Sequence, residues 1–204
     1  MPELDAGVVL EAMGTARAMR WLKPDPVPAE LLDKLVWAAT RATSPNNQQP
    51  WDFVVVQDAA TRREIGRLAA TLLEGRPPHA GAHLDPATRR TVEGGLHLIR
   101  NLAEVPAIIF ICGTEVALYG EVKPHYLCSA VYAAAQNLLV AARALGLGAT
   151  FTTLHERFES TIRQLLGIPD AHRIAATIPI GWPARSFGPV SRKPLREVVH
   201  HDRW

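Results

Sequence analysis

The chain has 204 residues, of which 48% are hydrophobic and 21% are charged, and its formal net charge is +2 at pH 7. This composition is typical of a globular protein that buries a sizeable core without metal or disulfide cross-links, and we expect one domain over residues 1–204. A nearly neutral chain gives no indication of a nucleic-acid partner or of binding to an anionic membrane. No apolar stretch approaches the ~20 residues that span a bilayer, so neither membrane insertion nor export is expected.

Cysteine and histidine usage argues against redox and metal sites. Cys112 and Cys128 lie in apolar patterns without a CxxC spacing, which indicates reduced, packed thiols in a cytoplasmic protein. His79 and His83 have the four-residue spacing of a helical metal pair, but Gly81 lies between them and two prolines precede them. We therefore expect no metal site.

A basic segment follows the short amphipathic helix predicted over residues 4–14. Arg17, Arg20 and Lys23 lie within seven residues that contain no acid, and apolar side chains alternate with them. This alternation indicates a half-buried segment, and a half-buried cation without a counter-charge favours binding of an anion. The alternative is a solvated charged face.

A second helix, expected over residues 28–39, leads into the loop Ala-Thr-Ser-Pro-Asn-Asn-Gln-Gln-Pro-Trp at residues 42–51. Pro45 and Pro50 exclude a helix around themselves, and the Ser and Asn side chains offer the backbone local hydrogen bonds. The uncharged donors of this loop suit a neutral ring system that forms several hydrogen bonds better than they suit an ion. An ordinary connection between a helix and a strand is the alternative.

The remaining pattern predicts an α+β fold, a small mixed or antiparallel sheet surrounded by helices. Strands are expected over 51–57, 105–112, 148–153 and 173–181, and further helices over 58–75, 89–103, 126–145 and 156–166. Asp58 is expected to cap the helix that it precedes. Pro179 indicates a bulge or an edge in the last strand. Four apolar residues of this strand are expected to share one face: Ile174, Ala176, Ile178 and Ile180.

Two further regions bear on ligand access and assembly. The range 75–125 contains loop-like segments on both sides of a strand, and we expect it to supply a mobile lid or a substrate pocket. The helix 126–145 is apolar on nearly every side, so it must be buried all round, and a second copy of the chain would cover it. We therefore expect a homodimer.

Three motifs, taken in order, resemble those of the nitroreductase family of FMN-dependent oxidoreductases. Ser-x-x-Asn-x-Gln-Pro-Trp at 44–51 follows the basic segment and a Pro-x-Pro-Val-Pro turn at 24–28. Gln-Asn-Leu-Leu at 136–139 precedes Gly-Leu-Gly at 146–148, and Arg-Lys-Pro-Leu ends the resemblance at 192–195. The resemblance implies the family's fold and an intertwined homodimer with FMN bound between the two subunits.

The resemblance also assigns residues to the FMN site. The phosphate and ribityl chain would contact two basic segments: Arg17, Ala18, Arg20, Arg192 and, as the second candidate beside Arg192, Lys193. The loop would contact the ribityl chain through Ser44 and the ring edge through Asn47 and Gln49. The flavin ring would also contact a segment in which many relatives have Gly-Gly or Glu-Gly in place of the last two residues: Phe151, Thr152, Thr153 and Leu154.

In the family, the region before the long helix shapes the substrate pocket, so the resemblance implies substrate contacts from Tyr119, His125 and Tyr126. The alternative for His125 is that it caps the start of the helix. Relatives often have two adjacent arginines followed by Ser, whereas Ala16 and Ala18 flank Arg17 here. At least one side-chain contact of the family is therefore missing or made by the backbone.

The resemblance implies that NAD(P)H passes a hydride to N5 of the flavin, which then reduces an electron-poor nitroaromatic or quinone by a ping-pong mechanism. No catalytic side chain is expected, since we find no Ser/His/Asp or Cys/His arrangement. Three alternatives remain open: a flavin-fragmenting enzyme, a reductive dehalogenase and a non-catalytic flavin-storage protein. A dinucleotide-binding dehydrogenase is disfavoured because no strand is followed by GxGxxG.

Overall fold

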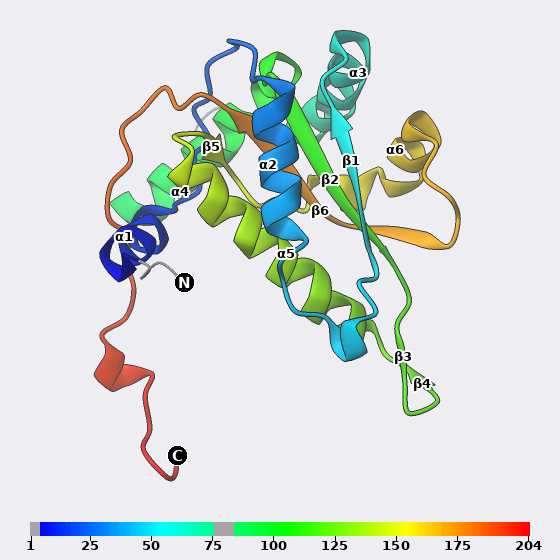
Figure 1. The fold of residues 1–204 in the computed structure, drawn as a ribbon. Helices are drawn as coiled ribbons and strands as arrows, with labels where there is room; N and C mark the ends of the chain where they lie inside the picture. Colours follow the sequence, from blue (N-terminus) through cyan, green and yellow to red (C-terminus); the bar gives the residue numbers. More distant parts are fainter. Residues whose placement is uncertain (1–4, 76–83) are drawn as a thin grey trace.

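The computed structural model describes residues 5–75 and 84–204 and confirms the α+β fold (Figure 1). Four strands form the main sheet in the order β1-β2-β6-β5, and every pair is antiparallel. These strands are β1 (Trp51–Val56), β2 (Ala107–Thr114), β5 (Gly148–Ala149) and β6 (His172–Gly181). A separate hairpin joins β3 (Ala117–Leu118) to β4 (Glu121–Val122).

The α-helices of the described residues are α1 (Ala6–Thr15), α2 (Ala29–Ala39), α3 (Ala59–Ala70), α4 (Pro86–Arg100), α5 (Pro124–Ala144) and α6 (Glu159–Leu166). Short 3-10 helices are η1 (Pro45–Asn47), η2 (Thr71–Leu73), η3 (Leu102–Glu104), η4 (Leu154–Arg157) and η5 (Leu195–Glu197). Carboxylates cap three of the α-helices, because each accepts hydrogen bonds from free backbone N–H groups: Asp5, Asp58 and Asp85. The predicted cap at Asp58 is confirmed.

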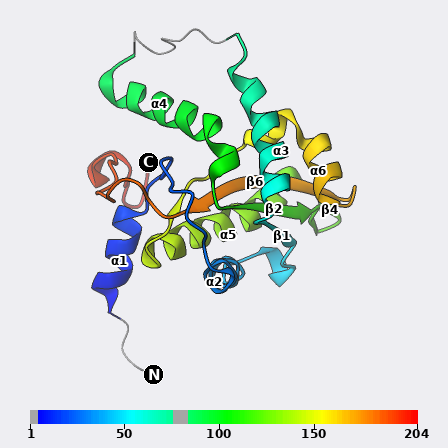
Figure 2. The same ribbon diagram turned by 90° about the horizontal axis from the view of Figure 1, so that it is seen from above.

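Helices cover both faces of the sheet, with α2 and α5 on one face and α3, α4 and α6 on the other (Figure 2). Strand β2 supplies both cores, since Ile109 and Ile111 point to the first face while Ile108 and Phe110 point to the second. All four of these side chains are fully buried. This double burial explains why β2 reads as a continuous apolar run.

The prediction that Ile174 shares a face with the later apolar residues of β6 is wrong. The register between β2 and β6 shifts where Ile111 pairs with Ala176 while Cys112 pairs with Ile174, so one extra residue of β6 bulges out. Because side chains alternate along a strand, this extra residue turns Ile174 to the second core, whereas Ala176, Ile178 and Ile180 pack in the first.

Pro179 does not mark an edge, because β6 lies between β2 and β5. The N–H of Thr177, two residues earlier, points toward Thr152. The missing N–H of Pro179 would point to the same side, where β5 pairs only with Ile180 and Gly181. The register places Thr150 opposite Pro179, so the proline lies at the point where the pairing with β5 ends.

Several boundaries differ from those predicted. The expected loop after β2 contains the β3–β4 hairpin, and α5 begins at Pro124. The expected strand 148–153 is shortened to two residues and one isolated bridge between Thr152 and Thr177, because η4 follows at once. Helix α4 begins at Pro86, a favoured first position. The proposed lid between Gly75 and Leu84 and the pair His79 and His83 lie outside the described residues.

Helix α5 packs one side against the sheet, where Ala134, Ala135 and Leu138 are buried, but Tyr132 on another side is 46% exposed. A single chain therefore does not bury α5 all round, and the homodimer stays a prediction. Within 5–75 and 84–204, no helix is both long and apolar enough to cross a membrane.

The two cysteines are free thiols. Cys112 is buried in β2, and burial, followed by the negative charges of Asp52 and Glu159, raises its pKa to about 12. This thiol is therefore protonated and unreactive near neutral pH.

We expect Gly66→Ala to destabilise the protein by about 1–3 kcal/mol, measured by urea unfolding. A Cβ at Gly66 in α3 would lie 2.7 Å from Ala103 Cβ and 2.8 Å from Ala103 N, and backbone atoms yield only if η3 moves. Gly95→Ala in α4 is the matched control, since no atom lies within 4 Å of its Cβ position. The control should gain up to about 1 kcal/mol from helix propensity. Equal stability changes in the two variants would contradict the close contact between α3 and η3.

Candidate functional site

A pocket of about 460 Å³ lies beside the end of α1, and its lining residues come from 13–20, 136–151 and 187–192. This volume is within the range of small-molecule pockets. Leu139 and Phe151 form part of an apolar wall, and arginine side chains supply the positive charge of the lining. The pocket is therefore amphipathic and suits a ligand with an anionic group and an apolar body.

Three arginines predicted from the sequence, Arg17, Arg20 and Arg192, line this one pocket, together with Ala18 and Phe151. None of the described lining residues is acidic. Arg20 is half-buried, and its pKa is lowered first by burial and then by the positive charge of Arg17. Both causes oppose the charged form of the guanidinium, whereas an anion bound beside it would favour that form.

Backbone hydrogen bonds hold the basic segment, residues 15–23, against a second segment that we call the strap, residues 182–192. Lys23 N donates to Trp182 O at 2.8 Å, and Ala184 N of the strap donates to Trp21 O at 2.9 Å. Val190 N of the strap donates at 2.9 Å to the carbonyl of Gly14, the residue before the basic segment. These bonds bring Arg192 to the pocket that Arg17 and Arg20 line.

The end of β5 anchors the middle of the basic segment. Met19 N donates to Ala149 O at 2.9 Å, and Thr150 Oγ1 donates to Met19 O at 2.7 Å. A Cβ at Gly148 would lie 2.6 Å from Met19 Cγ, so only glycine allows this approach. Met19 is therefore buried, and its neighbours Ala18 and Arg20 are placed on the pocket wall.

Arg143, in the last turn of α5, is a fourth guanidinium of the pocket, and sequence reasoning missed it. Gln136, two turns earlier, also lines the pocket. Both were overlooked because the helix was judged by its many apolar residues. The available signal was the seven-residue spacing of two polar side chains, which places them on one side of an apolar helix.

The structure does not bring the polar loop to this pocket. Ser44 Oγ accepts from Gln49 N at 3.0 Å, and Gln48 Nε2 donates to Ala117 O at 3.2 Å, so the loop is bound to the β3–β4 hairpin. Asn46, Asn47 and Gln49 have positive φ angles of 49°, 54° and 50°. Such angles are uncommon outside glycine and are found at ligand-binding sites.

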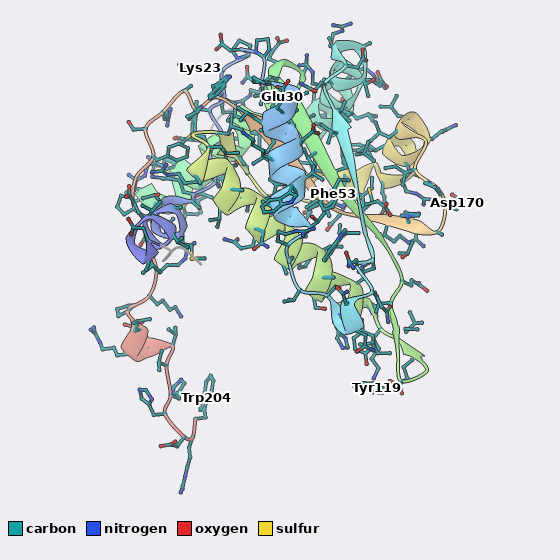
Figure 3. The ribbon with its side chains drawn as sticks, viewed as in Figure 1. Lys23, Glu30, Phe53, Tyr119, Asp170 and Trp204 are labelled. Carbon is teal, nitrogen blue, oxygen red and sulfur yellow. The ribbon has the colours of Figure 1, made fainter. Side chains whose placement is uncertain are left out.

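Contacts of Gly113 place the loop near the N-terminal end of α5, because a Cβ there would meet both Pro50 O and Leu127 Cδ1. From Leu127 to Gln136, the first residue of α5 that lines the pocket, the helix rises by about 14 Å. Tyr119 lies at the tip of the hairpin at this distant end (Figure 3). His125 and Tyr126 lie in the first turn of α5. None of the residues of this end that the structure describes lines the pocket.

The other predicted ring contacts have separate partners. Phe151 lies edge-on to Tyr132 with ring centroids 5.6 Å apart, and Thr152 Oγ1 donates to Thr177 O at 2.8 Å. Leu154 packs against the second core, and Thr153 is exposed before η4. Lys193 is exposed and does not line the pocket, whereas Arg192 does.

A model of the nitroreductase family matches residues 14–182 of the chain. The NADH dehydrogenase of Thermus thermophilus is 31% identical, over 98% of this chain and 97% of the relative. Iodotyrosine deiodinase 1 of Rattus norvegicus is 26% identical, over 93% of this chain and 67% of the relative. A solved structure of iodotyrosine deiodinase bound to FMN and 3-iodo-L-tyrosine shares the fold, with a TM-score of 0.72 at 21% identity over 96% of this chain and all of that one.

We expect the free energy of unfolding to decrease as the pH falls below about 6.5 because His155 is buried next to Leu154. Its Nδ1 lies 2.9 Å from Thr177 Oγ1, and burial lowers its pKa. A lowered folded pKa means that the unfolded chain protonates first, so the stabilising contribution exists above the unfolded pKa and is lost on acidification.

Urea unfolding of His155→Gln between pH 7.5 and 5.5 measures this effect. The variant should be less stable at pH 7.5 and should show a flatter pH dependence than the unmodified protein. His201→Gln is the control, because His201 is exposed near the C-terminus. An unchanged pH dependence in His155→Gln would show that this imidazole does not titrate with unfolding.

Proposed function

Because the chain belongs to the nitroreductase family, we propose that it is an FMN-dependent oxidoreductase that passes hydride from NAD(P)H to an electron-poor molecule such as a nitroaromatic or a quinone. The observation that carries this proposal is the pocket in which Arg17, Arg20 and Arg192 meet without an acidic neighbour among the described lining residues. A phosphate dianion would supply the missing counter-charge through charge-assisted hydrogen bonds.

The residues present fit FMN. Arg17, Arg20 and Arg192 would hold its phosphate, Ala18 lies between the first two, and Leu139 and Phe151 offer apolar contacts beyond them. When bound, FMN supplies the hydride chemistry, and the protein supplies binding, orientation and electrostatics. Of the described residues that line the pocket, none is His, Cys, Asp or Glu, so a cofactor that carries the chemistry itself suits this site.

We also propose that a second copy of the chain completes the site, so that the functional protein is the predicted homodimer. The loop with Ser44, Asn47 and Gln49 lies near Leu127, about 14 Å along α5 from the pocket of its own chain, so these residues would contact the FMN of the other subunit. Apolar side chains remain exposed on α1, whose Met13 lines the pocket, among them Val8 at 63% and Leu10 at 66%. Burial of such surface favours association.

The same pocket would receive NAD(P)H and then the acceptor, which gives ping-pong kinetics. Tyr119, His125 and Tyr126 would line the acceptor side from the other subunit, because the loop and the β3–β4 hairpin are joined by the hydrogen bond from Gln48 to Ala117 O. The free thiols Cys112 and Cys128 support a cytoplasmic location.

Reductive dehalogenation is the second candidate function. The observation that favours it is the similarity to iodotyrosine deiodinase 1 of Rattus norvegicus, which extends over 93% of this chain. The two candidates share the FMN site and differ in the acceptor. A flavin-storage protein would share the site as well, but it would not oxidise NAD(P)H.

Anaerobic mixing of the FMN-loaded protein with NADH or NADPH should bleach the flavin absorbance within seconds, since turnover of enzymes is typically about 1 to 10³ per second. Subsequent addition of a nitroaromatic or a quinone should restore the absorbance. Release of iodide from 3-iodo-L-tyrosine, without reaction of the other acceptors, would favour the dehalogenase. Absence of bleaching with both nucleotides would exclude the proposed reductase.

Arg17→Gln should weaken FMN binding by about 10- to 100-fold, because one charge-assisted hydrogen bond is worth roughly 1.5–3 kcal/mol. Binding of riboflavin, which lacks the phosphate, should change little. Fluorescence quenching measures both affinities, and Arg67→Gln on α3, whose side chain pairs with Glu64, is the control. A similar loss for both flavins would place the phosphate elsewhere.

A further inference from the structure

Arg143 differs from the other pocket arginines, because its guanidinium contacts both segments that carry them. We propose that Arg143 is a positioning residue that fixes the basic segment and the strap relative to each other, so that Arg17, Arg20 and Arg192 meet at the phosphate. This inference rests on the proposed function, in which these three arginines hold the phosphate of FMN.

The first contact is to Thr15, with which the basic segment begins and α1 ends. Arg143 Nε donates to Thr15 Oγ1 at 2.8 Å, and Thr15 Oγ1 donates to Glu11 O at 2.7 Å. Thr15 is the last residue of α1 and lies two positions before Arg17. Arg143 therefore fixes the point at which the chain leaves α1 and enters the pocket wall.

The second contact is to the strap. The guanidinium carbon of Arg143 lies 4.5 Å from the centroid of the Phe187 ring. The next residue, Gly188, approaches Arg17, because a Cβ on Gly188 would lie 3.6 Å from Arg17 Nη1. Phe187 thus holds the strap where it passes the arginine of the basic segment.

This contact matters because the middle of the strap has few other anchors. Backbone hydrogen bonds fix the strap at Ala184 and Val190, but none joins 185–189 to another described residue. Side chains hold this stretch instead, with Arg185 over the Trp21 ring at 3.5 Å and Phe187 under Arg143. Arg192 lies a few residues beyond, so the path of the strap to Arg192 depends on these two stacking contacts and on the bond from Val190 N to Gly14 O.

The geometry favours a positioning role for Arg143 over a direct contact with phosphate. Its side chain is 23% exposed, its Nε is used by Thr15, and one guanidinium face is covered by Phe187. Its Nη2 lies 3.9 Å from Glu11 Oε1, and that carboxylate is 72% exposed, so the ion pair is weak. By contrast, Arg192 Nη1 donates to the neighbouring Ser191 O at 2.8 Å.

Arg143→Lys tests the inference, because lysine keeps the charge but has neither the planar face nor the Nε donor. Loss of one stacking contact and one hydrogen bond should weaken FMN binding about tenfold. Riboflavin binding should stay within about twofold, since the segments converge at the phosphate. Arg67→Lys on α3 is the control for the same substitution at an exposed pair.

Phe187→Leu is the second variant, because it removes the stacking partner and leaves all four guanidinium groups in place. It should also lower FMN affinity and spare riboflavin affinity. The double variant Arg143→Lys, Phe187→Leu should lose less FMN affinity than the product of the two single losses, because both substitutions break the same contact. Thermal unfolding of each variant establishes that the protein is folded.

Three results would overturn the inference. If Arg143→Lys retains FMN affinity while Arg143→Met loses it, the charge alone acts. If both flavins lose affinity equally, Arg143 supports the fold and not the phosphate site. If the single losses multiply in the double variant, the two residues act independently. Failure of the unmodified protein to bind FMN would refute the proposed function instead.

Discussion

Four guanidinium groups face one pocket, and their mutual repulsion is the constraint that the surrounding structure has to balance. The repulsion is visible at Arg20, whose pKa is lowered by burial and by the charge of Arg17. Backbone bonds from residues 14–23 to Ala149 and to the strap oppose it. The cations are therefore held together before an anion arrives, and an anion that binds meets a preformed site.

The sheet supplies the rigid part of this arrangement. Strand β6 pairs with β2 along its length, and its last residues pair with Gly148 and Ala149 of β5. Because Ala149 accepts the hydrogen bond of Met19, the middle of the basic segment is attached directly to the buried sheet. Glycine at 148 is required for that attachment, since a side chain would overlap Met19.

Local patterns predicted the elements well, because Asp58, the apolar run of β2 and the turn prolines act through neighbouring residues. They predicted a bulge or an edge at Pro179, but they did not locate the bulge that turns Ile174 to the second core, since it depends on pairing with β2. The alternation of cations and apolar residues indicated an anion site at Arg17 and Arg20, whereas Arg192 was selected by the family resemblance alone. Arg143 was missed because its contacts, Thr15 and Phe187, are distant in the sequence and become visible only in the folded chain.

The unbalanced charge of the pocket also affects how fast a ligand arrives. A cluster of cations beside a low-dielectric wall focuses the electric field outward and draws anions toward the opening during diffusion. Salt screens this attraction over about 10 Å at 0.1 M ionic strength, so capture of a phosphorylated molecule slows as salt rises, whereas capture of an uncharged one does not. The same four side chains thus discriminate between ligands during the encounter, before any hydrogen bond forms.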